Sequence, residues 1–157
     1  MCDNYAQWPP IEDWIRALFP NLQHDDYEET SGQTCNYNCI GWAAEDTQHW
    51  WWPSEDGFWP LGLPLDDESI ENFQNAFRLT RNYEPCDNGN LEDGFQKVAI
   101  YAIAGRVKHM ARQLESGSWT SKLGFGWDIS HHTLEGVNCN QYGEVAGFMR
   151  SQRVVGI

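Results

Sequence analysis

The sequence predicts an α+β fold in which helices come first and an antiparallel sheet follows. Before about residue 95, apolar residues recur at the three- and four-residue spacing of amphipathic helices. After Lys97 the pattern changes to short apolar, β-prone runs separated by glycine-containing turns, which is typical of a strand meander. Because the helical runs precede the strands instead of alternating with them, we expect α+β and not a parallel α/β sheet.

The length and composition predict a single domain over residues 1–157. A chain of 157 residues with 41% hydrophobic and 21% charged side chains is ordinary for one globular domain. We divide it into an irregular N-terminal segment (1–38), a helical part (39–96) and a β meander (97–157).

Three helices are expected before the meander. A short one is predicted over Ile11–Leu18, between prolines. Residues 21–38 are polar and turn-rich, which indicates irregular structure. The next helix begins near Asn38 as a cap and continues to Trp50, before Pro53 ends it. The third follows Asp66 and buries residues at helical spacing, namely Ile70, Phe73, Ala76 and Phe77.

The meander is predicted from alternation and turn residues. The segment between residues 124 and 136 is expected to be mostly loop, with one helical turn at His132–Glu135. Turns are expected at Ala104-Gly105 and around Ser116-Gly117. The expected strands cover residues 97–103, 109–114, 119–123 and 145–155.

Charge and segment composition exclude several classes of partner. The net charge of −13 repels phosphate backbones, so no nucleic-acid partner is expected. Residues 1–95 carry 19 acidic and 3 basic side chains, which predicts an acidic, solvated surface on this half. No apolar run is long enough to span a membrane and no secretory pattern opens the chain, so no membrane partner is expected. The five cysteines are odd in number and form no CxxC pair, which favours a reducing, cytoplasmic compartment.

One pair of residues carries the pattern of a chemical site. Cys39 opens a predicted helix, where exposed N–H groups and the helix dipole favour a thiolate. His109 opens a strand farther along the chain, and an imidazole against a thiol is the basic unit of cysteine hydrolases. For such a pair we expect the sulfur near a His109 ring nitrogen, with both side chains bordering an open cleft.

The two segments around this pair resemble the motifs of NlpC-type cysteine peptidases and amidases, a papain-like family. The nucleophile segment is Asn38-Cys-Ile-Gly-Trp-Ala43, and the histidine segment runs from Val98 through His109 to the return strand at Trp119-Thr-Ser121. The resemblance covers roughly residues 27–124 and implies a papain-like fold. The blocks around Cys39, Trp50-Trp-Trp-Pro53 and Trp119–Gly124 also resemble an uncharacterised bacterial family, which implies no activity.

The resemblance implies further roles around the pair. The third catalytic residue corresponds to Ser121, although Asp128, His131 or His132 are alternatives because serine orients an imidazole less firmly. For substrate binding the resemblance makes Trp42, Tyr27 and Gln33 candidates. Of these, Tyr27 or Gln33 would complete an oxyanion hole with the Cys39 N–H.

Each candidate also has a structural interpretation. Cys39 is equally understood as a small buried side chain and His109 as a core histidine. The tryptophans of Trp50-Trp51-Trp52 are expected mainly in the core, with at most one facing a ligand. The spacing of His131, His132 and Cys139 fits no zinc signature, so we expect neither a metal nor a cofactor.

Two functions from different classes follow. The first is a thiol hydrolase acting on a peptide or other amide-containing substrate, located in the cytoplasm or exported by a specialised secretion route. The second is a catalytically inactive papain-like binding or scaffold module. It would contact a partner protein through its Trp-rich loop and acidic face.

Overall fold

The computed structural model describes residues 10–23, 26–124 and 126–153. Within these residues, seven strands form one antiparallel sheet in the order β1-β6-β5-β4-β3-β7-β2, together with three short α-helices. The helices are α1 (Ile11–Leu18), α2 (Cys39–Ala43) and α3 (Ile70–Arg81), and η3 (Leu134–Val137) is a 3₁₀ turn. The strands are β1 (Tyr27–Ser31), β2 (Glu84–Cys86), β3 (Phe95–Ile103), β4 (Arg106–Gln113), β5 (Trp119–Lys122), β6 (Asp128–His131) and β7 (Glu144–Gln152). The predicted α+β class is confirmed.

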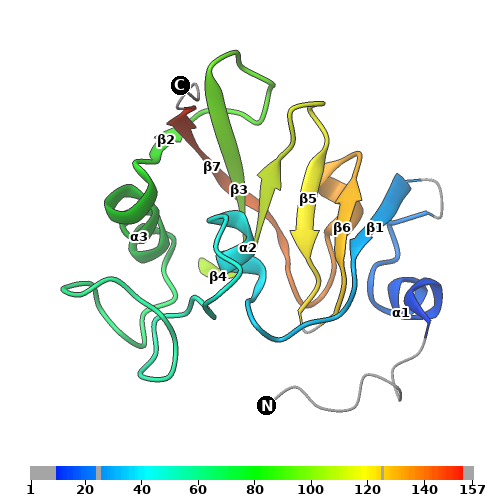
Figure 1. Ribbon diagram of the computed structural model, residues 1–157, viewed down its shortest axis with the longest axis horizontal. Helices are drawn as coiled ribbons and strands as arrows, with labels where there is room; N and C mark the ends of the chain where they lie inside the picture. Colours follow the sequence, from blue (N-terminus) through cyan, green and yellow to red (C-terminus); the bar gives the residue numbers. More distant parts are fainter. Residues whose placement is uncertain (1–9, 24–25, 125, 154–157) are drawn as a thin grey trace.

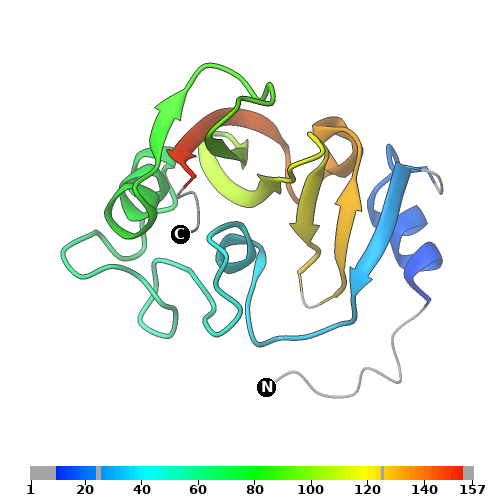
Figure 2. The same ribbon diagram turned by 45° about the horizontal axis from the view of Figure 1, so that its top comes forward.

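The sheet separates two hydrophobic clusters because β3 is buried on both faces. Val98 and Ile100 point into a cluster with α3, whereas Ala99 and Tyr101 point into one with α1. This alternation follows from the two-residue period of a strand. Figures 1 and 2 show α3 and α1 at opposite ends of the molecule, with the sheet between them. Residues 98–102 of the strand are therefore a continuous buried apolar run with no polar face.

Two expectations from the sequence need correction. Residues 21–38 are not irregular throughout, because Tyr27–Ser31 pairs with β6 as the edge strand β1. Its polar, mostly exposed side chains carry no apolar alternation, so the pattern gave no strand signal. Residues 128–131, expected in a loop, form β6 between β1 and β5. Of the predicted last strand, residues 154 and 155 lie outside the described residues.

The helix predicted to reach Trp50 is a single short turn. It ends at Ala43, and Glu45 takes a left-handed conformation with φ of 61°. The Asp46 carboxylate then accepts hydrogen bonds from the Gln48 backbone N–H and the Trp51 indole at 2.8 Å each. This turn redirects the chain so that Trp51 enters the core, where it is fully buried. Burial of Trp51 overrides the helical spacing of the sequence.

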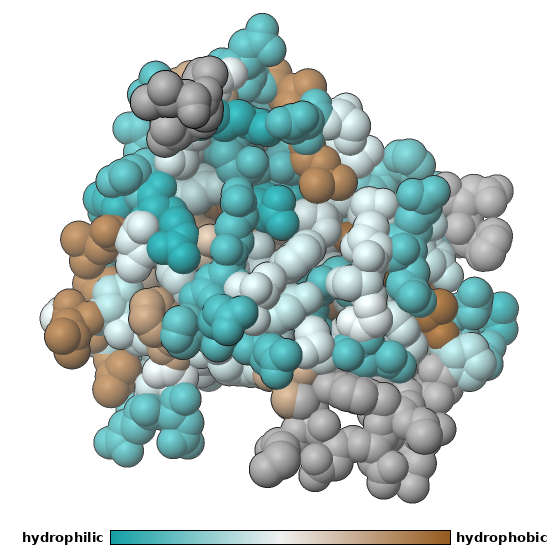
Figure 3. All heavy atoms as spheres, in the orientation of Figure 1, coloured by the Kyte–Doolittle hydropathy of each residue, from teal (hydrophilic) through white to brown (hydrophobic). Residues whose placement is uncertain are grey.

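The long irregular segment between α2 and α3 carries strongly exposed apolar side chains. Leu61 is 100% exposed and Leu65 is 47% exposed, whereas Trp59 of the same segment is buried. Figure 3 shows hydrophobic residues gathered on this side of the surface, with hydrophilic ones around them. The tryptophan-rich segment therefore contributes both to the core and to an apolar surface.

We predict that Gly143→Ala destabilises the protein by about 3 kcal/mol or more in chemical denaturation. Gly143 has φ of 73°, a left-handed conformation that costs an L-residue about 1–2 kcal/mol. A Cβ there would also collide with the Ala102 carbonyl, adding about 1–3 kcal/mol of overpacking. Gly62→Ala is the matched control, because Gly62 has φ of 91° but open space around it. An equal loss of unfolding free energy in the two variants would contradict the predicted collision with the Ala102 carbonyl.

Candidate functional site

The Asn38 side chain fixes the position of Cys39. Its Oδ1 accepts hydrogen bonds from the Gly41 N–H, which caps α2, and from the Trp51 N–H, both at 3.0 Å. Its Nδ2 donates to the Trp51 carbonyl at 2.7 Å. One buried amide therefore caps the helix and holds a distant backbone segment against it. The N-cap predicted from the sequence is confirmed.

Cys39 occupies a gap in the sheet. Pairing of β4 with β5 is limited to Arg112↔Thr120 and Gln113↔Trp119, although β4 begins at Arg106. The Met110 N–H, two residues before the last pair, bonds to the Cys39 thiol. The nucleophile candidate therefore lies beside the strand residue that follows His109.

Burial dominates the electrostatics of the Cys39 thiol. Burial raises its pKa to about 11, and the backbone N–H groups of Met110 and Ile40 lower it by less. The sequence led us to expect a depressed pKa from a long helix, but α2 has five residues and a correspondingly small dipole. The resting cysteine at neutral pH is therefore a thiol.

A chain of hydrogen bonds runs from His109 across three strands. His109 Nε2 lies 2.9 Å from Ser121 Oγ, which lies 2.8 Å from His131 Nε2. His131 Nδ1 lies 2.9 Å from the Thr133 carbonyl oxygen. The structure therefore brings His109 and Ser121 together, and adds His131, which the sequence left as one of several alternatives. Asp128 and the exposed His132 do not bond to His109.

This chain determines which nitrogen of each ring carries the proton. Burial lowers the pKa of His109 well below its usual value and that of His131 to about 4, so both rings are neutral at pH 7. The Thr133 carbonyl only accepts, so His131 donates from Nδ1 and accepts at Nε2. The Ser121 hydroxyl then donates to His131 and accepts from His109 Nε2–H. By this assignment His109 Nδ1 bears a free lone pair.

The free lone pair is buried. His109 Nδ1 has no hydrogen-bond partner among the described residues, and the side chain is fully buried. The Tyr142 ring stacks on the imidazole with centroids 4.0 Å apart, and Tyr101 contacts it edge-on at 5.2 Å. Cys39 retains 8% of its surface. The expectation that both side chains border an open cleft is therefore wrong, and no hydrogen bond joins them.

Two ionisable side chains lie buried beside this site. Lys122 and Asp128 face each other across β5 and β6, and both are fully buried. Asp128 Oδ2 accepts hydrogen bonds from the Tyr37 hydroxyl, at 2.5 Å, and from the Ser31 hydroxyl. Lys122 Nζ donates to the Gly126 carbonyl. The sequence analysis gave Lys122 no role, because one lysine on a strand carries no pattern of its own.

The predicted substrate-binding residues are dispersed. Trp42 lies beside β5, where its indole N–H donates to Thr120 Oγ1 at 3.0 Å and its ring stacks on Tyr37. Tyr27 lines a cavity of about 310 Å³ formed with α1, and Gln33 lies in the loop after β1. None of the three bonds to Cys39, His109 or Ser121 among the described residues.

The cysteines divide into two kinds. Cys39, Cys86 and Cys139 are free, whereas Cys35 is disulfide-bonded. A disulfide is typical of oxidising compartments and does not favour the reducing compartment expected from the cysteine count. The cytoplasmic location stays a prediction. In the described part of the chain, no three His, Cys, Asp or Glu side chains are grouped to hold a metal ion. No helix described here has the length and apolar character to cross a membrane.

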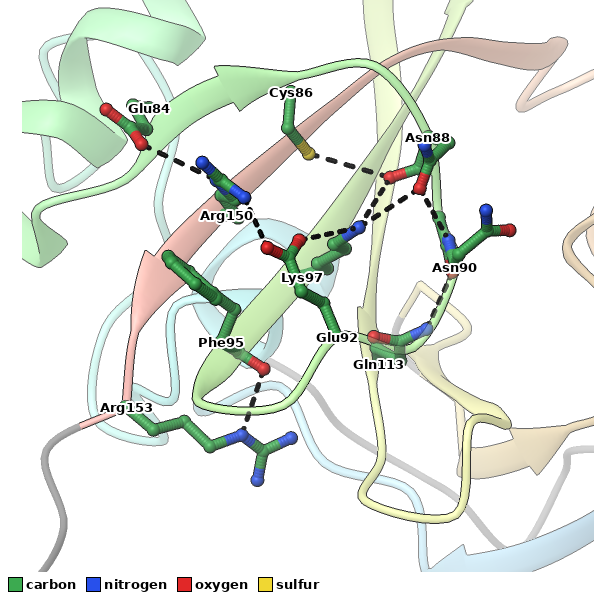
Figure 4. Close-up of polar contacts among 11 residues, drawn as sticks. Glu84, Cys86, Asn88, Asn90, Glu92, Phe95, Lys97, Gln113, Arg150 and Arg153 are labelled. Atoms are coloured by element: carbon green, nitrogen blue, oxygen red, sulfur yellow. Dashed lines mark hydrogen bonds and ion pairs between the residues drawn. The ribbon is translucent and has the colours of Figure 1, made fainter.

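A second polar network, absent from the sequence analysis, holds the loop between β2 and β3 (Figure 4). The Lys97 ammonium lies 3.3 Å from Glu92 and donates to the carbonyl and side-chain oxygens of Asn88, at 3.1 Å each. Glu92 also pairs with Arg150 at 2.5 Å. Each charge has an opposite charge beside it, so this network is a structural clamp.

Comparison with known proteins identifies the family but no activity. Residues 28–150 match the model of the family described as Domain of unknown function (DUF7689). Because the match covers most of the sequence, the chain belongs to this family. No curated protein and no solved structure matches the chain. The resemblance to an uncharacterised family is thus confirmed, and the papain-like resemblance stays a hypothesis.

We predict that the protein loses stability as the pH falls from about 6.5 towards 4. Both buried histidines have folded-state pKa values below that of the unfolded chain, so the unfolded state binds more protons in this window. Each histidine then lowers the free energy of unfolding by up to about 1.4 kcal/mol per pH unit. Urea denaturation at several pH values measures this slope.

His131→Gln should reduce that slope by about one histidine's share, because glutamine does not titrate. A slope that is the same in wild type and His131→Gln would contradict the assignment of His131 as neutral and buried.

Proposed function

We propose that this protein is a cysteine hydrolase that cleaves an amide bond, with Cys39 as nucleophile and His109 as general base. The observation that carries the proposal is the tautomer of His109. Its Nε2 is committed to Ser121 and its Nδ1 bears a buried, unpartnered lone pair. A neutral imidazole in this state is ready to accept one proton.

The position of Cys39 supports the same proposal. The Met110 backbone N–H hydrogen-bonds to its sulfur, and Met110 directly follows His109 along β4. The resemblance of this segment to NlpC-type enzymes points to the same residues. A papain-like arrangement of helix, histidine strand and return strand is therefore part of the proposal.

The chemistry balances as follows. His109 Nδ1 takes the thiol proton while the sulfur attacks the carbonyl carbon, giving a tetrahedral oxyanion. When the C–N bond breaks, the proton on Nδ1 passes to the leaving amine, and the acyl group stays on the sulfur. His109 then removes a proton from water, which attacks the thioester, and returns it to the sulfur. Ser121 and His131 hold the ring in the required tautomer throughout.

Burial sets a condition on this mechanism. Tyr142 covers one face of His109, and a thiol with a pKa of about 11 is a weak nucleophile at neutral pH. Substrate binding must therefore bring the thiol and imidazole together, so that proton transfer is coupled to attack. The rate of hydrolysis should therefore depend more on substrate binding than on the population of thiolate in the free protein.

NlpC-type enzymes, which the chain resembles, usually act on peptidoglycan peptides. We predict that Cys39→Ala and His109→Gln abolish release of amine from a digest of these peptides. Ser121→Ala should lower the rate about 10-fold to 100-fold, because the ring loses its orientation but keeps its base. Cys86→Ser is the matched control, since Cys86 is a free thiol that bonds only to the Asn88 carbonyl.

The variants must be compared at equal folded fraction. Cys39→Ala removes a buried sulfur and should cost about 1 kcal/mol, so circular dichroism must show that it is folded. Retained activity in folded Cys39→Ala would exclude Cys39 as the nucleophile. Absence of wild-type activity on these peptides, on p-nitrophenyl acetate and towards iodoacetamide would count against hydrolysis altogether.

The surface of the segment between α2 and α3 favours a second candidate function, a binding module without chemistry. Leu61 and Leu65 are exposed, and the same segment carries the exposed acidic side chains Glu55, Asp56 and Asp66. A partner protein with an apolar patch and basic rim would complement this surface. The two functions differ in one measurement, because a binding module shows no difference between wild type and Cys39→Ala in any turnover assay.

A further inference from the structure

Two arginines from different elements line the same hollow of the surface. Arg81 is the last residue of α3, and Arg153 directly follows β7. Both side chains line a cavity of about 450 Å³ and a second cavity of about 690 Å³. Because the two cavities also share Ser151 and Gln152, we treat them as two parts of one site, the arginine hollow. Volumes of this size are typical of sites for small molecules.

The Arg81 guanidinium is held in place but keeps unused donors. Its Nε donates to the Ala44 carbonyl at 2.8 Å and its Nη1 to the Thr80 carbonyl at 3.1 Å. The guanidinium also lies 5.2 Å from the centre of the Trp51 ring. Among the described residues, no carboxylate pairs with Arg81 and its Nη2 has no hydrogen-bond partner. A guanidinium has five N–H donors, so this cation is oriented and still able to bind an anion.

Arg153 is anchored in a similar way. Its Nε donates to the Phe95 carbonyl at 3.1 Å (Figure 4). Its Nη1 lies 3.2 Å from Glu115, a side chain that is 88% exposed. Water screens an exposed pair, so Glu115 neutralises Arg153 only weakly. Its Nη2 has no hydrogen-bond partner in the described part of the chain.

Arg150, which lines the larger part of the hollow, differs from these two arginines. It pairs with Glu92 at 2.5 Å and with Glu84 at 3.5 Å, so its charge is already matched. Its guanidinium lies over the Phe95 ring, 4.3 Å from the ring centre. Phe95 lines the same part of the hollow and gives it an apolar wall beside the cations.

The charge of the hollow is opposite to that of the whole chain. The chain has 23 acidic and 10 basic side chains, yet the larger part of the hollow is lined by three arginines and one carboxylate, Glu84. A net charge of −13 repels anions from most of the surface. Binding of an anion therefore requires a local group of cations such as this one.

We infer that the arginine hollow binds a small organic molecule with two carboxylates, one held by Arg81 and the other by Arg153. The planar fork of a guanidinium matches the two oxygens of a carboxylate. Two anchored forks on separate elements favour a ligand with two anionic groups, and the Phe95 wall favours a carbon body between them. The inference is independent of the proposed function, because neither Cys39 nor His109 lines the hollow.

The test is calorimetric titration of the full chain at pH 7 and fixed ionic strength. The probes are malonate, succinate, glutarate and adipate, which vary the separation of the two carboxylates, with acetate and inorganic phosphate for comparison. At least one of the four diacids should bind saturably with one site per chain, about tenfold or more tighter than acetate and phosphate, because it engages both arginines.

Arg81→Met and Arg153→Met should each weaken binding of that diacid about tenfold or more. Arg78→Met is the matched control, because it removes the same charge from the same helix. Arg78 is exposed, bonds to Asn75 and lines neither cavity, so its removal should leave the affinity nearly unchanged.

Circular dichroism must show that each variant is folded, because Arg81 also holds the Ala44 carbonyl. If Arg81→Met does not fold, Arg153→Met decides the test. Arg81→Lys gives a further measurement, since it keeps the charge and loses the fork, and it too should weaken binding.

Three results would overturn the inference. The first is that none of the four diacids binds more tightly than acetate. The second is that inorganic phosphate binds as tightly as the best diacid, which would make the hollow a site for a single small anion. The third is that Arg78→Met weakens binding as much as Arg153→Met, which would assign the effect to the overall charge of the protein.

Discussion

The candidate site depends on the point where β4 and β5 stop pairing. Before Arg112, β4 remains paired with β3 but has no paired residue on β5. The start of α2 packs against β4, and the Met110 N–H hydrogen-bonds to the Cys39 sulfur. Asn38 holds α2 there by its hydrogen bonds to Gly41 and Trp51. The end of the strand pairing and the helix cap together fix the position of Cys39.

Burial then determines the charge states of the site. The low dielectric of the interior keeps His109 and His131 neutral and Cys39 protonated, and it destabilises the Lys122 ammonium. Neutral histidines are what a directional chain of hydrogen bonds requires, because a protonated ring would donate from both nitrogens. The same burial that makes the thiol unreactive at rest therefore gives His109 a defined acceptor at Nδ1.

The helix over Ile70–Arg81 and the strands β3, β4, β5 and β7 were predictable because each is a local pattern. Ser69 caps α3, and the two-residue alternation of the strands survives in the folded sheet. Other elements were not predictable, among them β2 and β6. β1 has exposed, acidic side chains and is a strand only because β6 offers its edge, while α2 stops early because Trp51 must reach the core.

The sequence alone determined the residue types of the site and their order: a capped cysteine, a histidine on a strand and a serine on the return strand. Their chemistry follows from the side chains themselves. Only the tertiary structure decided that His131 completes the chain, that Tyr142 covers His109, and that Lys122 is buried opposite Asp128. These features depend on strand register and on exclusion of water, which arise from contacts between distant segments and leave no local pattern.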